Sequence, residues 1–160
     1  MRARARLFGH PIHQMLIVFP LGLLTTAVIL DVVHLVRGGQ LSATMAFWLI
    51  AGGIVGGLVA AIFGLIDWLS IPRDTRARRI GLLHGVGNVV VVALFAGSWL
   101  LRRDQPLSPE TLALVLSFAG AALAMVTGWL GGELVDRLGV GVDEGANLNA
   151  PSSLSGPAIR

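Results

Sequence analysis

The chain has 160 residues, of which 54% are hydrophobic and 13% are charged, and its formal net charge is +3. Soluble domains carry about 25% charged residues, so this composition indicates a membrane protein. The sequence contains no cysteine, lysine or tyrosine, which excludes disulfides, iron–sulfur ligands, covalently attached c-type haem and Schiff-base catalysis. All twelve basic residues are arginines; in a membrane protein they relate to topology and anionic lipid, and no nucleic-acid partner is expected.

Residues 1–14 are predicted to form a basic N-terminal arm that opens with "MRARAR". A basic start followed by an apolar run also occurs in secretory signal peptides. Here the run is long, has no small-residue cleavage site, and carries Asp31 and His34 near its end. We therefore expect a retained helix.

Four apolar segments follow, and each has the roughly 20 residues that a helix needs to cross the hydrocarbon core. Backbone groups in lipid have no water to bond, which favours helices. The sequence therefore predicts an all-α fold, an integral membrane four-helix transmembrane bundle over residues 15–138, with short loops and a flexible C-terminal tail. The predicted helices cover about residues 11–36, 43–69, 80–101 and 110–135.

Local signals shape these helices and the tail. Pro11 suits the first turn of the first helix, where a missing N–H costs nothing, and Pro20 should kink it. Residues 139–160 are rich in Gly, Ser, Asn and Pro and are predicted to be disordered. No sequence repeat is evident between the two halves.

Small residues recur at helical spacing in the second and fourth helices and are predicted to let helix backbones approach closely. These stripes also suit the interface of a homo-oligomer. They comprise Gly53, Gly57, Ala60 and Gly64 in the second helix, and Gly120, Ala124, Gly128 and Gly132 in the fourth.

The arginines predict the orientation of the bundle. Nine of the twelve lie before the first helix, between the second and third, or after the fourth, and only Arg37, Arg102 and Arg103 lie on the other side. Positive residues concentrate on the cytoplasmic side. We therefore expect a multi-pass protein of a bacterial cytoplasmic (inner) membrane with both termini in the cytoplasm.

This topology brings polar residues from every helix to a similar depth near the cytoplasmic face. Ionisable groups inside a membrane are costly and are usually paired or functional. The predicted cluster consists of His13, Asp67, His84, Asn88, Trp129 and Glu133. Asp31 and His34, at the outer end of the first helix, are interpreted as an interfacial polar pair.

Two histidines from two parallel helices are the usual ligands of b-type haem. We expect His13 and His84 to face each other as such ligands, with Asn88 one turn deeper than His84. Arg76, from the loop between the second and third helices, would meet a haem propionate. Asp67 or Glu133 would accept the second N–H of a ligand histidine.

Other readings of the same residues stay open. His10, His13, Asp67, His84 and Glu133 could hold a metal ion or move protons. Alternatively, Asp67 could simply pair with His84 or Arg76 and close the helix ends, or the cluster could line a quinone-type polar pocket.

Three segments together resemble a widespread bacterial four-span family, the domain-of-unknown-function family 2231. They read "FGHPIHQMLIVFPLGL", "GLIDWLSIPRDTRARRIGLLHGVGN" and "GWLGGELVDRLGVGV", and the resemblance covers residues 7–142. The resemblance implies recurrent positions at His10, Pro11, His13, Pro20, Asp67, His84, Asn88, Gly131, Gly132 and Glu133. Gln14 departs from the proline that the family often has there. Relatives occur fused to Rieske or cytochrome c modules, which implies that some members of the family act together with redox proteins.

The sequence thus favours membrane electron transfer through haem b bound by His13 and His84, with a redox protein or a larger membrane complex as partner. The alternative is a non-enzymatic accessory or structural subunit of a larger membrane complex. Whether the chain is an enzyme stays open.

Overall fold

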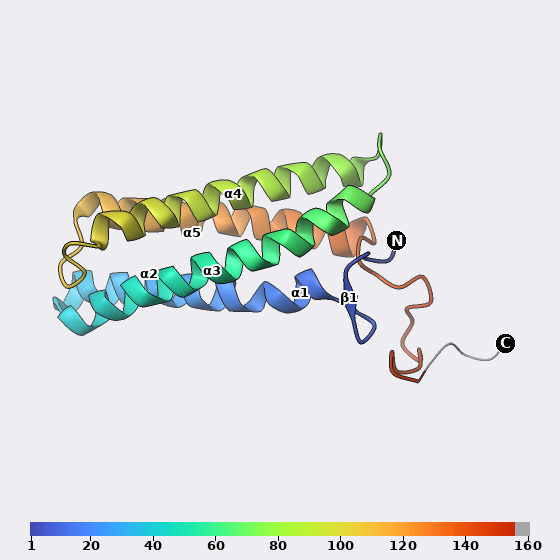
Figure 1. The fold of residues 1–160 in the computed structure, drawn as a ribbon, viewed down its shortest axis with the longest axis horizontal. Coiled ribbons are helices and arrows are strands. Elements are labelled where there is room, and N and C mark those ends of the chain that lie inside the picture. Colours follow the sequence, from blue (N-terminus) through green and yellow to red (C-terminus); the bar gives the residue numbers. More distant parts are fainter. Residues whose placement is uncertain (156–160) are drawn as a thin grey trace.

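The computed structural model describes residues 1–155 and confirms the all-α bundle of four long helices (Figure 1). A short antiparallel hairpin precedes the bundle, and a π-helical turn ends its last helix. The elements are β1 (Arg6–Leu7), β2 (His10–Pro11), α1 (Ile12–Leu16), α2 (Val18–Arg37), α3 (Gln40–Ser70), α4 (Arg76–Arg102), α5 (Thr111–Gly132) and η1 (Glu133–Arg137).

Four helical stretches are long and apolar enough to cross a membrane: Ile12–Arg37, Gln40–Ser70, Arg76–Arg102 and Thr111–Arg137. Their outward faces carry many exposed large apolar side chains, which suits contact with lipid. Two of the helices begin earlier than predicted, because their first turns are polar and hydropathy alone misses them. At α4 the Thr75 side chain accepts a hydrogen bond from the Arg78 backbone N–H and caps the helix start.

The first span is divided into two helices three residues before Pro20. The break between α1 and α2 falls at Ile17, close to Leu16, whose carbonyl loses its helical donor because proline has no N–H. Pro20 itself is buried in α2 and lies against Gly56 of α3. On the N-terminal side of this break, α1 packs against α3.

The N-terminal arm packs beneath one end of the bundle, which we call the terminal end; it also carries the α3–α4 loop and η1 (Figure 1). β1 and β2 pair around Phe8 and Gly9, which both have positive φ, as a type I′ turn requires. Arg6 hydrogen-bonds to the Gly9 carbonyl across this turn.

Several residues of the segment 139–155, which is predicted to be disordered, hydrogen-bond to the arm. The Met1 ammonium donates to the Gly139 carbonyl at 2.9 Å, and the Gly141 N–H donates to the Met1 carbonyl at 2.9 Å. Arg2 forms an ion pair with Asp143 at 2.8 Å. Residues 156–160, the rest of that prediction, lie outside the described part.

The two halves of the bundle repeat each other, which the sequence did not reveal. The four buried positions of α2 recur in α4 with a constant offset of 71 residues, and five of the seven buried positions of α3 recur in α5 with an offset of 67. The α2 and α4 pairs are Pro20 and Val91, Leu24 and Phe95, Ala27 and Ser98, and Asp31 and Arg102. The α3 and α5 pairs are Ala46 and Ala113, Phe47 and Leu114, Ile50 and Ser117, Gly53 and Gly120, and Ala60 and Thr127.

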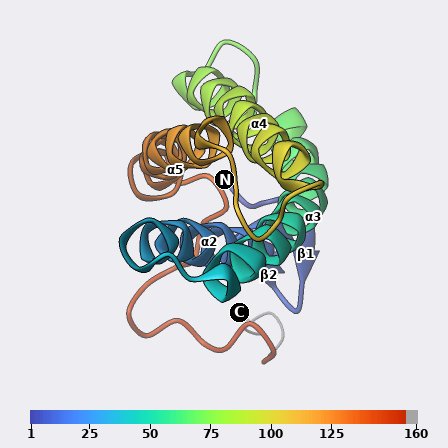
Figure 2. The same cartoon turned by 90° about the vertical axis from the view of Figure 1, so that its left-hand side faces the viewer.

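Contacts repeat along with burial. Leu24 packs where Gly53 has no Cβ, and its equivalent Phe95 packs where Gly120 has none. Seen end-on, the helices follow one another around the bundle (Figure 2), and α3 packs on α4 while its equivalent α5 packs on α2. The bundle is therefore two helical hairpins, α2–α3 and α4–α5, related by a pseudo-two-fold axis along the bundle. α2 and α4 run in parallel on opposite sides of that axis.

Candidate functional site

The structure brings His13 and His84 together at the terminal end. Their ring centroids lie 6.3 Å apart and the ring planes are nearly perpendicular, at 89°. His13 comes from α1, which continues into α2, and His84 comes from α4. The offset between them is again 71 residues, so they are equivalent positions of the two halves that meet near the pseudo-two-fold axis.

Each imidazole is held in the same way by the second helix of its own half. His13 Nδ1 lies 2.8 Å from the Ala60 carbonyl of α3, and His84 Nδ1 lies 2.8 Å from the Thr127 carbonyl of α5. A carbonyl can only accept, so both rings carry their proton on Nδ1 when neutral. The lone pair of each ring is consequently on Nε2.

A glycine lies beside each ring, four residues after the carbonyl that holds it. A Cβ at Gly64 would lie 2.9 Å from His13 Cε1, and a Cβ at Gly131 would lie 3.2 Å from His84 Cε1. Gly64 and Gly131 are separated by the same 67 residues as the other α3 and α5 pairs. Each ring thus occupies a notch that exists because the neighbouring helix has a glycine, Gly64 or Gly131, at that position.

Asn88 supports His84 from one turn deeper in α4. Its Nδ2 donates to the His84 backbone carbonyl at 2.8 Å, and its Oδ1 accepts from the Thr127 hydroxyl at 3.1 Å. Asn88 Nδ2 lies 3.4 Å from His84 Nδ1 and 3.2 Å from Nε2. Because Asn88 Nδ2 is nearly as close to the protonated Nδ1 as to Nε2, it does not lie along the Nε2 lone pair, which stays available.

The other predicted site residues bond elsewhere. Asp67 Oδ1 accepts from the backbone N–H groups of Arg4 and Ala5, at 2.8 and 3.0 Å, and so anchors the arm. Arg76 and Glu133 form an ion pair at 2.6 Å between α4 and η1. Within residues 1–155, backbone carbonyls rather than these carboxylates accept from the rings of His13 and His84.

The five predicted metal ligands do not form one group. His10 lies in the hairpin, with Nε2 3.3 Å from the Ser153 hydroxyl, and Asp67 and Glu133 are engaged as above. Across residues 1–155 no three His, Asp or Glu side chains lie close enough to hold a metal ion.

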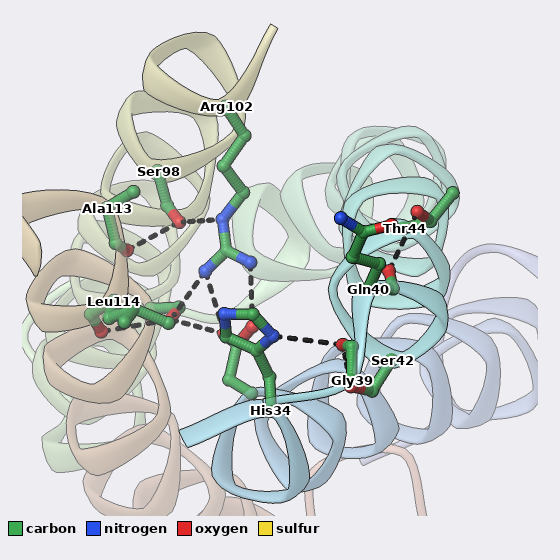
Figure 3. A network of polar contacts seen from close by, with 11 residues as sticks. His34, Gly39, Gln40, Ser42, Thr44, Ser98, Arg102, Ala113 and Leu114 are labelled. Atoms are coloured by element: carbon green, nitrogen blue, oxygen red, sulfur yellow. Dashed lines mark hydrogen bonds and ion pairs between the residues drawn. The ribbon is translucent and has the colours of Figure 1, made fainter. Parts of the chain in front are cut away.

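The opposite end of the bundle holds an ion pair that sequence reasoning missed (Figure 3). Asp31 and His34 are not a pair: Asp31 receives two hydrogen bonds from Arg102, at 2.6 and 2.7 Å, and both side chains are 0% exposed. His34 Nδ1 lies instead 3.0 Å from the Gly39 carbonyl. We call Asp31 and Arg102 the axial ion pair.

Two hydroxyls complete the axial ion pair. Ser98 lies one turn before Arg102 on α4 and accepts from its Nε at 3.2 Å, and Ser117 of α5 donates to Asp31 at 2.9 Å. One signal in the sequence could have found the pair. Asp31 follows His13 by 18 residues, and Arg102 follows His84 by the same number, which is five helical turns.

Because Nδ1 of each imidazole bonds to a backbone carbonyl, Nε2 is the ring nitrogen through which either histidine could ligate a metal. A metal bound to an imidazole nitrogen lies about 2.0–2.1 Å from that nitrogen. It therefore lies roughly 3.2 Å from the centre of the imidazole ring once the ring radius is added. The ring centroids of His13 and His84 lie 6.3 Å apart, which is about twice that distance.

Comparison with known proteins places the chain in a family without giving its activity. The family described as "Predicted membrane protein (DUF2231)" matches residues 9–144. Neither curated proteins nor solved structures give a match. The match spans most of the chain and all four transmembrane helices, so the chain belongs to this family of predicted membrane proteins, domain of unknown function 2231.

Proposed function

We propose that the protein is a b-type haem electron carrier of a bacterial inner membrane, in which His13 and His84 would hold the haem. One observation carries this proposal: the two halves present equivalent imidazoles, each with Nδ1 on a backbone carbonyl, with ring centroids 6.3 Å apart. A backbone carbonyl on the second ring nitrogen is the common partner of metal-ligating histidine.

The surroundings suit a flat macrocycle. α2 and α5 contact each other much less than the helices of each hairpin do, so the seam between the hairpins is the looser one. On the α5 side, Gly128 and Gly132 have nothing within 4 Å of where a Cβ would stand. Arg76, which is 58% exposed, supplies a cation near this end for a propionate.

A haem bound here supplies one-electron redox chemistry. The protein's own residues would set its environment: the Ala60 and Thr127 carbonyls fix the ring tautomers, and Asn88 holds the helix next to His84. The site lies near the arginine-rich end, which we assign to the cytoplasm with both termini. A redox protein or a larger membrane complex on that side would exchange electrons with it.

The test is an absorption spectrum, oxidised and reduced, of protein purified in detergent from cells with ample haem. We expect the bands of a six-coordinate, bis-histidine haem, which His13→Ala and His84→Ala each abolish. His10→Ala and His34→Ala are matched controls, because these histidines lie away from the pair, and both should keep the wild-type spectrum. Wild-type protein without haem, or variants at His13 and His84 with unchanged spectra, would contradict the proposal.

A second candidate is a non-enzymatic accessory subunit of a larger membrane complex. The observation that favours it is the open glycine face: Gly128 and Gly132 of α5 and Gly85 of α4 have nothing within 4 Å, as a helix-packing surface would. Partners that co-purify with the protein, together with wild-type behaviour of His84→Ala in cells, would favour this role over electron transfer.

A further inference from the structure

The axial ion pair and the histidine pair occupy the two ends of one repeated face. Along the span formed by α1 and α2, and along α4 alike, 18 residues separate the histidine from the charged residue, which corresponds to five turns and about 27 Å of helix. The positions between them on this face, at seven, eleven and fourteen residues after each histidine, are buried in both halves. An interaction that sets the axial position of α2 relative to α4 at the ion-pair end therefore also sets it at the histidine end.

Apolar helix faces alone define register weakly in a membrane, since lipid is as apolar as the side chains and small residues allow sliding contact. The axial ion pair is different. Its two hydrogen bonds, at 2.6 and 2.7 Å, join atoms that are fully buried. A shift by one turn, or a rotation of either helix, would leave a charge unpaired at a position where that is strongly unfavourable.

The charges also determine which halves can pair. The first half contributes the carboxylate, and the second contributes the guanidinium and both hydroxyls. The equivalents of Ser98 and Ser117 in the first half are Ala27 and Ile50, which are likewise 0% exposed. Two copies of the same half would bring like charges together on the axis.

We infer that Asp31 and Arg102 are positioning residues: they pair the first hairpin with the second in one register and so hold His13 and His84 at the same depth. The inference concerns the meeting of the two rings and does not require a bound haem. Its failure is therefore distinct from failure of the proposed function.

The test measures the two distances separately by cross-linking, which the absence of cysteine in the chain makes possible. His13→Cys with His84→Cys reports contact between the halves. His13→Cys with Gly64→Cys reports contact within the first half, because Gly64 lies beside the His13 ring. A short thiol cross-linker is applied to the full chain in detergent.

We expect Asp31→Ala and Arg102→Met each to slow cross-linking between the halves by about a hundredfold, while the rate within the first half stays unchanged. A general loss of folding would lower both rates. Wild-type rates between the halves in Asp31→Ala would overturn the inference.

The decisive variant exchanges the whole polar layer between the halves. It combines Asp31→Arg, Arg102→Asp, Ala27→Ser, Ser98→Ala, Ile50→Ser and Ser117→Ile. The pseudo-two-fold relation predicts that these substitutions rebuild the same contacts with the roles of the two halves exchanged. We expect it to restore the rate between the halves, and Asp31→Arg with Arg102→Asp alone to restore less, because the hydroxyls would then lie on the wrong side. If the complete exchange fails to restore that rate, with or without loss of the rate within the half, the inference is wrong.

Discussion

At the scale of single residues, the notches beside the two imidazoles depend on the absence of a side chain. A Cβ at Gly64 would lie 2.9 Å from His13 Cε1 and 3.0 Å from Nδ1, closer than carbon atoms pack. Such a Cβ must push the ring away from the Ala60 carbonyl. Gly131 stands in the same relation to His84, with slightly more space at 3.2 Å.

Gly64→Ala is therefore expected to lower both the ratio of haem to protein and the melting temperature in detergent, and Gly131→Ala is expected to do so less. Alanine is favoured over glycine in a helix by about 1 kcal/mol, so a decrease runs against the intrinsic trend. Gly85→Ala is the matched control on α4, because nothing lies within 4 Å of its Cβ position. Equal behaviour of all three variants would show that the notches do not matter.

At the scale of the elements, the proline in α2 affects how α1 presents His13. Alanine at position 20 would restore a donor for the Leu16 carbonyl and favour a continuous helix. It would also remove the ring that fits against Gly56. We expect Pro20→Ala to keep or raise the helical circular dichroism signal while lowering haem content, because the straightened helix moves His13 away from Ala60. Unchanged haem content would mean that the break is not needed for the site.

The contact between the N-terminal arm and the tail depends on Asp143. Its carboxylate accepts from the Gly145 backbone N–H and from Arg2, which hold its pKa below the ordinary value of 3.8. A lowered folded-state pKa means that the contact is favoured at pH values above the ordinary carboxyl range and is lost as the pH falls through the lowered value.

Asp143→Asn at pH 7 should accordingly imitate acidification. We expect faster hydrogen exchange at the Gly141 N–H, which bonds to the Met1 carbonyl, with no change in the four long helices. Glu144→Gln is the control, since Glu144 is an exposed neighbour with no ion pair in the described part of the chain. Equal exchange at Gly141 in both variants would contradict this role.

At the scale of the whole molecule, hydropathy and charge were sufficient for the architecture. Four apolar runs predicted four helices, and the distribution of arginines placed the starts of α1 and α4 at the same end, where His13 and His84 do meet. The same reasoning failed for the carboxylates. Whether Asp67 bonds to a ring or to the backbone of Arg4 depends on the path of the arm, which no periodicity encodes.

The internal repeat and the axial ion pair escaped prediction for a common reason. Equivalent positions share depth and burial but differ in chemistry: Leu24 is equivalent to Phe95, and Asp31 is equivalent to Arg102. Sequence comparison between the halves sees unrelated residues, and Arg102 reads as an ordinary flanking charge. The packing shows that two stretches of dissimilar sequence occupy equivalent positions in the bundle.

The axial ion pair also bears on the symmetry of the molecule. A symmetric dimer of identical hairpins must carry the same residue on both sides of its axis, so it could have had facing histidines but never an acid facing a base. Opposite charges there require two hairpins of different sequence, as in this chain. That difference in sequence is thus what lets the protein give up symmetry at one end while keeping it at the other.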